Sequence, residues 1–324
     1  MTNLTFGDLA RKINSEAEAY EYLESLRWPG KPVCPHCGVE TDHYFLKPAN
    51  GLDRKTRTGH VSQRRVWKCR SCRKQFSALT GTIFHGSKIP LQTWLLVFFE
   101  MCCNKNGIAA REIARRYGVA PKTAWFMTHR IREAMKSRGV PFSGDVVADE
   151  TYIGGDPANQ HLNKRTKRDT GKAAGTAKTP VVSLIDDDTG VARSTAVPWV
   201  DSASIRKIMK DNVDLATTVL HTDSATVYVP VARSMAGHFA VNHHAGEYVS
   251  EKSLGTQKVE NFFSQLKRSL DGTHHSVSVE HLPRYLAEFD FRYSTRKLSD
   301  TQRMALLMTR VPGRRLSYRP LIQD

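Results

Sequence analysis

The sequence predicts an α+β protein built from several domains, and three observations support this. At 324 residues, 40% of them hydrophobic, the chain is long enough for two or three domains with apolar cores. Apolar residues recur at helical spacing in some segments and alternate along short strands in others. Two Cys-x-x-Cys pairs indicate a small module held by a metal. We therefore expect a metal-stabilised module, a helical region and a mixed α/β domain.

The chain is strongly basic, which predicts a polyanionic partner. The formal net charge is +16, and residues 61–140 hold 16 Lys and Arg against three Glu. Such a field attracts nucleic acid and makes the affinity depend on salt, although a solvated basic surface is the alternative. No signal peptide is visible, and the most apolar run, residues 94–103, is too short to cross a bilayer. We expect a cytoplasmic, nucleoid-associated protein with no membrane partner.

Residues 1–30 are expected to form an N-terminal helix. Ser15 and Glu18 have the spacing of a capping box, and apolar residues follow at helical spacing. The motif Trp28-Pro29-Gly30 then ends the helix. We expect this segment to pack on its neighbours and to carry no chemistry.

Two cysteine knuckles define the next module, residues 31–84. Four thiolates can hold one zinc ion in a tetrahedral site that leaves no position open for a substrate, so the zinc is expected to be structural. Strand-like pieces at 44–46 and 65–68 suit a zinc ribbon. The absence of an export signal favours metal binding over disulfides, and a redox Cys-x-x-Cys is a further alternative. The four expected ligands are Cys34, Cys37, Cys69 and Cys72.

Residues 85–139 are predicted to form a helical DNA-binding region. Residues 91–103 form its core helix, and two further helices follow, joined by a tight turn at Gly118. Any two helices joined by a glycine turn share this helix-turn-helix pattern, but its basic surroundings favour DNA binding. The candidate DNA contacts are Lys122, Thr123 and Arg130 on the second helix, and Arg70, Arg73 and Lys74 on the second knuckle.

Residues 140–300 are predicted to form the mixed α/β domain, after a linker at 139–144. Residues 156–179 are expected to be a mobile basic loop that orders on DNA, and residues 301–324 a C-terminal tail. The expected elements are strands at 146–153, 180–185 and 191–197, a helix at 202–213 with Ser202 as its possible cap, strands at 217–221 and 239–242, and helices at 256–270 and from His281.

Three acidic residues of this domain are candidate metal ligands, each with a plainer alternative. Asp149 lies within an apolar strand, where an ionised carboxylate costs several kcal/mol without a compensating partner; it could also cap a fraying strand end. Asp223 ends a second apolar strand and could form an Asx-turn. Glu260 lies two helical turns before Lys267, and both could belong to a solvated helix face.

Other nearby acids compete for the same role. Glu150 follows Asp149 directly, and its side chain is expected to point to the opposite face of the strand. The acids at 186–188 lie where the sequence predicts a polar hairpin turn, which explains them without a metal.

In this order of elements the chain resembles a bacterial insertion-sequence DDE transposase, in the subfamily with an N-terminal zinc ribbon and an ISXO-like transposase domain. The resemblance covers nearly the full length. One departure is Gln257, which stands where related sequences often have Asn. The motifs that carry the resemblance are RWPGKPVCPHCG at 27–38, WKCRSCRKQFSALTGTIF at 67–84, DETYIGG at 149–155, HTDS at 221–224, VENFFSQLKR at 259–268 and YLAEFDFRY at 285–293.

The resemblance implies an RNase H-like catalytic domain with Asp149, Asp223 and Glu260 as its catalytic triad and Lys267 as the basic residue that follows. Three such acids can hold two Mg²⁺ ions about 4 Å apart, with Mn²⁺ as a possible substitute. The implied reaction is hydrolysis at the 3′ ends of the element, followed by strand transfer into target DNA. The implied partners are double-stranded terminal inverted repeats, target DNA and further copies of the chain bound to that DNA.

Two other functions are compatible with the sequence. A zinc ribbon and a helix-turn-helix also suit a non-catalytic DNA-binding regulator. The acidic triad also suits an RNase H-like nuclease that does not carry out strand transfer.

Overall fold

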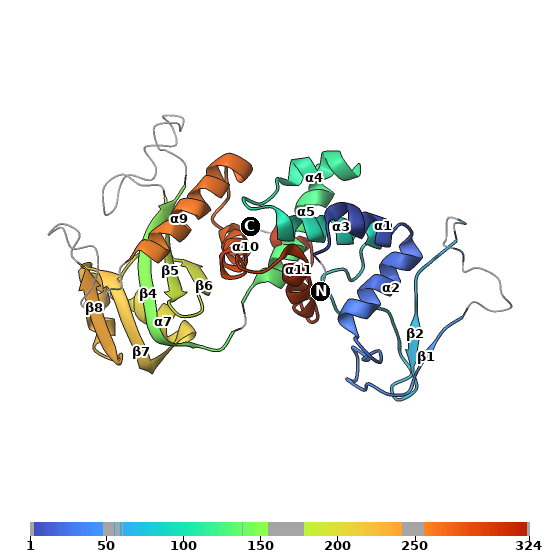
Figure 1. Ribbon diagram of the computed structural model, residues 1–324, viewed down its shortest axis with the longest axis horizontal. Helices are drawn as coiled ribbons and strands as arrows, with labels where there is room; N and C mark the ends of the chain where they lie inside the picture. The colour runs from blue at the N-terminus through green and yellow to red at the C-terminus, as the bar shows by residue number, and fades with distance from the viewer. Residues whose placement is uncertain are drawn as a thin grey trace. The chain divides into compact units, whose positions relative to one another are not determined.

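The computed structural model of the protein contains two compact units (Figure 1). It describes residues 3–47, 55, 59, 61–137, 139–154, 178–241 and 256–322. The first unit combines Met1–Met135 with Leu298–Asp324, and the second is Lys136–Lys297. Within these described ranges, no helix is long and apolar enough to cross a membrane.

The first unit combines helices with a small antiparallel sheet of order β1-β2-β3. The capping box at Ser15 and Glu18 is confirmed, since each side chain bonds the other residue's backbone N–H. The core helix predicted at 91–103 is present with the same bounds. The elements are α1 (Phe6–Lys12), α2 (Glu16–Arg27), β1 (His43–Phe45), β2 (Trp67–Cys69), β3 (Gln75–Phe76), α3 (Leu91–Cys103), α4 (Ala110–Tyr117), α5 (Pro121–Met135), α11 (Asp300–Thr309) and η6 (Arg319–Leu321).

The segment expected as a C-terminal tail contains α11, which belongs to the core of the first unit. Met304, Leu307 and Met308 recur at helical spacing, and each is at most 2% exposed. α11 contacts both α2 and α3. Burial of this apolar face explains why the segment is ordered.

A tight turn at Gly118 joins α4 to α5. Gly118 has φ +62°, in the left-handed region that a residue without Cβ adopts at little cost. Its backbone N–H donates to the Ala114 carbonyl and closes α4. Ile113 and Ala124 are buried, so the two helices share a core.

The second unit is a five-stranded mixed sheet of order β6-β5-β4-β7-β8. β4 pairs antiparallel with β5 and parallel with β7, β5 pairs antiparallel with β6, and β7 pairs parallel with β8. Apolar clusters cover both faces: α9 and α10 pack on one and α7 on the other (Figure 1). The elements are β4 (Phe142–Ile153), β5 (Thr179–Asp186), β6 (Ala192–Ala196), α7 (Ser202–Asn212), β7 (Val213–Asp223), η3 (Thr226–Tyr228), α8 (Val229–Ala232), β8 (Gly237–Val241), α9 (Gln257–Ser269), the π-helix η5 (Leu270–His274) and α10 (Leu282–Ser294).

The structure differs from the sequence-based expectation at several points. The linker expected at 139–144 overlaps β4, because Phe142 is buried and pairs with Val213 of β7. The cap of α7 is the Asp201 carboxylate, which accepts from Ser204 N–H, and not Ser202. The short elements β3, η3 and α8 were not predicted. Most of the basic loop expected at 156–179, namely residues 156–177, lies outside the described residues.

A buried ion pair within α10 gives a testable prediction about the stability of the second unit. Glu288 is fully buried and accepts from the Arg292 guanidinium at 2.6 Å. Glu288→Gln removes the negative partner of a buried cation, and we expect the free energy of unfolding to fall by about 3 kcal/mol. Urea denaturation measures this change. Asp188→Asn, at an exposed position of the same unit, is the control and should leave stability unchanged; equal stabilities of the two variants would contradict the prediction.

Candidate functional site

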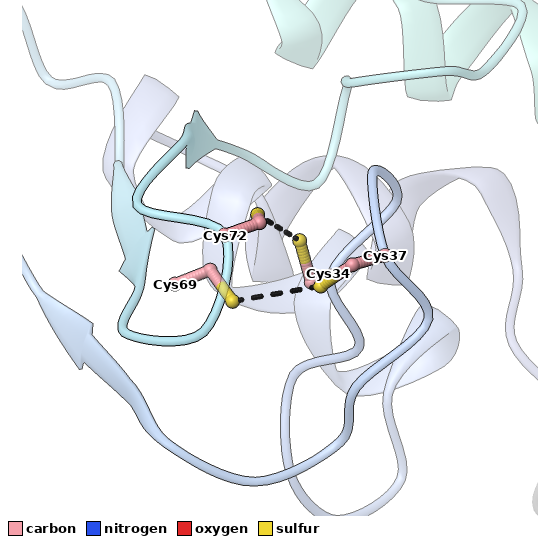
Figure 2. A group of neighbouring side chains, drawn as sticks. All are labelled: Cys34, Cys37, Cys69 and Cys72. Carbon is pink, nitrogen blue, oxygen red and sulfur yellow. Dashed lines mark hydrogen bonds between the residues drawn. The ribbon is translucent and has the colours of Figure 1, made fainter.

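The four predicted cysteine ligands converge in the first unit (Figure 2). The Sγ atoms of Cys34 and Cys72 lie 3.7 Å apart, as do those of Cys37 and Cys69, and all four lie within 4.8 Å of one another. A tetrahedral zinc ion with Zn–S bonds of about 2.3 Å requires sulfur separations of about 3.8 Å. The cluster therefore has the dimensions of a closed tetrahedral metal site.

Each cysteine pair sits on a backbone turn. In the first, Cys34 N–H donates to Val39 O and Gly38 N–H donates to Cys34 O, with Gly38 at φ +77°. In the second, Cys69 N–H donates to the Lys74 carbonyl, with Arg73 at φ +60°. These bonds hold the knuckles in shape. Three predicted DNA contacts on the second knuckle are exposed: Arg70, Arg73 and Lys74.

The register of the second sheet brings Asp149 and Asp223 to the same level. β4 and β7 are parallel, and Val147 of β4 pairs with His221 of β7. Two residues further along each strand are Asp149 and Asp223, on the same face as that pair. This face is the one that α9 covers, because Val147 clusters with apolar residues of α9. Glu260 lies in the first turn of α9.

The surroundings of Asp149 disfavour the ionised form of its carboxyl group. Burial, and then the charges of Glu150, Asp223 and Glu260, raise the pKa of Asp149 to about 7, although Glu150 N–H donates to Asp149 Oδ1 at 2.7 Å and opposes this shift. Asp223 and Glu260 are thus both within electrostatic reach of Asp149. Such a cluster is stabilised by a cation.

The oxygen atoms of these carboxylates do not converge on one point as the cysteine sulfur atoms do. Among the described residues, the cysteine cluster is the only group of three or more His, Cys, Asp or Glu residues whose ligand atoms lie within 4.8 Å of one another. Local hydrogen bonds hold two of the acids: Asp223 Oδ1 accepts from Ala225 N–H at 3.0 Å, and Glu260 Oε1 accepts from Thr256 Oγ1 at 2.7 Å. The Asx-turn expected as the alternative for Asp223 is therefore present in addition to its alignment with Asp149.

The competing acids have other partners. Glu150 lies on the opposite face of β4, as predicted, where the Tyr228 hydroxyl donates to Glu150 Oε2 at 2.7 Å. Burial raises the pKa of Glu150. In the β5–β6 turn, Asp186 accepts from Thr189 N–H and Asp187 pairs with the Lys258 ammonium at 2.5 Å.

Lys267 opens onto a polar cavity of about 340 Å³. It is exposed and shares the cavity wall with Lys178, Asp271 and His275. His275 has φ +58°, which is uncommon for a residue with a side chain. The cavity offers cationic groups for a phosphate at a distance of two helical turns from Glu260.

A histidine–aspartate pair beside the carboxylates was not anticipated from the sequence. His221 is 1% exposed, its Nε2 lies 2.7 Å from Asp145 Oδ1, and its ring stacks on Phe239. The pair bridges β4 and β7, the two strands that carry Asp149 and Asp223. Spacing was the available signal, since Asp145 and His221 precede those residues by four and two positions and share their face.

The predicted DNA contacts of α5 divide into two groups. Lys122 is exposed and Thr123 is partly exposed. The expectation for Arg130 is wrong: it is 4% exposed, donates to the His85 carbonyl at 2.6 Å, and packs on the rings of Trp94 and Phe126. Burial is the main cause that lowers the Arg130 pKa to about 10. Arg130 is a core residue.

Comparisons with known proteins identify two modules in the chain. Residues 141–294 match the model of the ISXO2-like transposase domain, and residues 14–75 match that of the transposase zinc-ribbon domain. A relative, described as an uncharacterized protein in transposable element ISH50 of Halobacterium salinarum, is 26% identical over 284 residues, covering 86% of this chain and 90% of the relative.

Two solved structures also match part of the chain. The first is the HTLV-2 integrase catalytic core domain in complex with magnesium, with 10% identity, a TM-score of 0.26, and coverage of 46% of this chain and 86% of that one. The second is the simian T-cell lymphotropic virus intasome in complex with the PP2A regulatory subunit B56 gamma, with 12% identity, a TM-score of 0.28, and coverage of 55% and 63%.

The cysteine geometry predicts one tightly bound zinc ion per chain. Cys37→Ser and Cys69→Ser should each lose this ion and unfold the small sheet β1-β2-β3 with its two knuckles, because bound metal stabilises a module this small in place of a large apolar core. Atomic emission on purified protein measures the metal. Cys102→Ser, on α3, is the matched control and should retain it; full zinc content in the Cys37 and Cys69 variants would contradict the assignment.

The raised pKa of Asp149 predicts how stability depends on pH in the metal-free protein. The folded protein holds this proton more tightly than the unfolded chain, so deprotonation between pH 4 and pH 7 opposes folding. Asp149→Asn should therefore gain on the order of 1–3 kcal/mol relative to the wild type across this range. Urea denaturation in a chelator measures both proteins.

The control is Asp201, an aspartate whose pKa is lowered and not raised. Hydrogen bonds from Ser204 lower the pKa of Asp201, so its stabilising effect is present at neutral pH and lost on acidification. The free energy of unfolding of Asp201→Asn should therefore drop below that of the wild type as the pH rises. Parallel pH profiles for the wild type and Asp149→Asn would refute the prediction.

Proposed function

We propose that this chain is the DDE transposase of an insertion sequence. The chain belongs to the transposase family that combines a transposase zinc ribbon with an ISXO2-like transposase domain. The observation that carries the proposal is the alignment of Asp149 with Asp223 on parallel strands, with α9 and Glu260 on the same face. The mixed sheet, in which an antiparallel hairpin follows the first strand, supports an RNase H-like catalytic domain.

The residues present fit a hard divalent cation. Asp149, Asp223 and Glu260 offer carboxylate oxygens, which Mg²⁺ prefers, and their mutual repulsion is relieved by positive charge. These three residues would hold two Mg²⁺ ions, which Mn²⁺ can replace. Bound magnesium supplies Lewis-acid activation of the attacking hydroxyl and stabilises the leaving oxygen. In the first unit, the four cysteines would hold one structural Zn²⁺.

The proposed reaction has two in-line displacements at phosphorus. In the first, the oxygen of water bonds to phosphorus and the bond to the 3′ oxygen breaks, which leaves a 3′-hydroxyl on the element and a 5′-phosphate on the flanking strand. In the second, that 3′-hydroxyl attacks a target phosphodiester and displaces a target 3′-hydroxyl. The protein needs no Ser or Tyr nucleophile. Lys267 binds a phosphate next to the reacting one and orients it.

The first unit is proposed to hold the terminal inverted repeats. α4, the Gly118 turn and α5 would act as a helix-turn-helix, with Lys122 and Thr123 at the groove. Exposed basic residues of the second zinc knuckle would contact phosphates. Because two element ends must be joined to one target, the active form is proposed to be a homo-oligomer on DNA.

The proposed roles predict separable defects. Asp149→Asn and Asp223→Asn should lower the rate of cleavage of a terminal repeat at least 1,000-fold, on the order expected for losing catalytic groups, and leave repeat binding unchanged. The repeat sequences are taken from the DNA that flanks the reading frame. Gel assays in Mg²⁺ measure both the binding and the cleavage of these repeats. Asp188→Asn, in the exposed β5–β6 turn, is the matched control and should cleave normally.

The same assays separate the alternatives. An unmodified protein that binds repeats and never nicks them would support a non-catalytic regulator. Nicking without joining of precut 3′ ends to target DNA would support a nuclease. Normal cleavage by Asp149→Asn would overturn the assignment of the site.

A further inference from the structure

The segment that follows α11 is basic and anchored to the first unit. Residues 310–322 contain four arginines and neither Asp nor Glu. Gly313 N–H donates to the Gly81 carbonyl at 2.8 Å. Arg314 is 7% exposed and donates to the Glu133 carbonyl at 2.9 Å. Both bonds are accepted by backbone carbonyls, and they fix the path of the segment on the first unit.

This segment runs alongside α5 in the opposite direction. Arg314 is tied to Glu133, near the end of α5, whereas the Tyr318 ring contacts Phe126 at 5.3 Å and lies beneath the Lys122 ammonium at 4.8 Å, near its start. From Glu133 back to Phe126 the helix axis covers about 10 Å. The four residues from Arg314 to Tyr318 can span about 13 Å when extended. The two paths therefore match.

Positive charge gathers along this path. Arg315 and Arg319 are exposed, and so is Lys122. After burial, the charge of Arg315 is the next cause that lowers the pKa of Arg130 and of His85, which shows that like charges crowd here. A polyanion relieves such crowding by neutralising several cations at once.

We propose that residues 312–319 form a C-terminal arm that binds the phosphates of duplex DNA beside α5, through Arg315 and Arg319. The inference rests on the proposed DNA-binding function of the first unit. Tyr318 is a positioning residue that fixes the arm on α5. Its ring makes T-shaped contacts with Trp125 and Phe126 and carries the Lys122 ammonium over one face, so these neighbours already engage the ring that an unpaired base would stack on. This favours duplex DNA over single strands.

The test is the salt dependence of DNA binding by the full-length protein. The probe is a 30-base-pair duplex of arbitrary sequence, and its affinity is measured by fluorescence anisotropy from low to moderate salt. Each lost phosphate contact should reduce the slope of log affinity against log salt by about 1. We expect this reduction in Arg315→Ala and in Arg319→Ala, but not in Arg315→Lys. Arg206→Ala, an exposed arginine of α7, is the matched control and should keep the wild-type slope.

Variants of Tyr318 test the positioning role. Tyr318→Phe keeps the ring contacts and should bind like the wild type, whereas Tyr318→Ala should lose affinity several-fold and reduce the slope. Unchanged slopes in both arginine variants would overturn the arm. Tighter binding by Tyr318→Ala would also overturn it, because the arm would then be covering α5. If the unmodified protein does not bind the duplex, the DNA-binding function itself fails.

Discussion

The parallel pairing of β4 with β7 is the constraint on which the candidate active site depends. It sets Asp149 beside Asp223, although 74 positions separate them in the chain. Two carboxylates on one face repel each other, so the strands must be held together by other means. Apolar clusters on both faces supply the larger contribution, and the contact of buried His221 with Asp145 adds a polar link between β7 and β4 on the face that carries the acids.

α10 supports this arrangement on the same face of the sheet, over β6, through polar contacts as well as apolar ones. Asp290 accepts from both the backbone and the side chain of Ser194 on β6, and Ser194 Oγ lies 2.8 Å from Ser183 Oγ on β5. Ser183 pairs with Asp149 in the sheet register. A row of polar groups therefore crosses the sheet from the acids to α10. Burial raises the pKa of Asp290 to about 7, as it does for Asp149.

Patterns in the sequence were sufficient to predict those features that depend mainly on local interactions. The bounds of α3 followed from continuous apolar residues, and the cap at Ser15 followed from the spacing to Glu18. The cysteine cluster followed from the pairing of two knuckles. The family followed from motifs, since periodicity alone leaves the roles of Asp149 and Asp223 open.

Tertiary context decided what the sequence could not predict. Arg130 looked like a groove contact because it is charged and follows Lys122 on the helix, but long arginine stems pack well on aromatic rings and Trp94 lies across from it. Phe142 looked like part of a linker because Pro141 and Gly144 flank it, yet its ring is buried. The His221–Asp145 contact depends on strand register, which only the folded sheet reveals.

The chain leaves the first unit after Met135 and returns to it at Leu298, so the second unit is inserted into the first. α11 fills part of the core that α2 and α3 begin. During synthesis on the ribosome, the N-terminal helices and the zinc knuckles emerge first but have no α11 to complete their core until the entire second unit has been translated. The first unit is therefore started early and finished late, and a truncated product that ends within the second unit leaves its apolar surface uncovered.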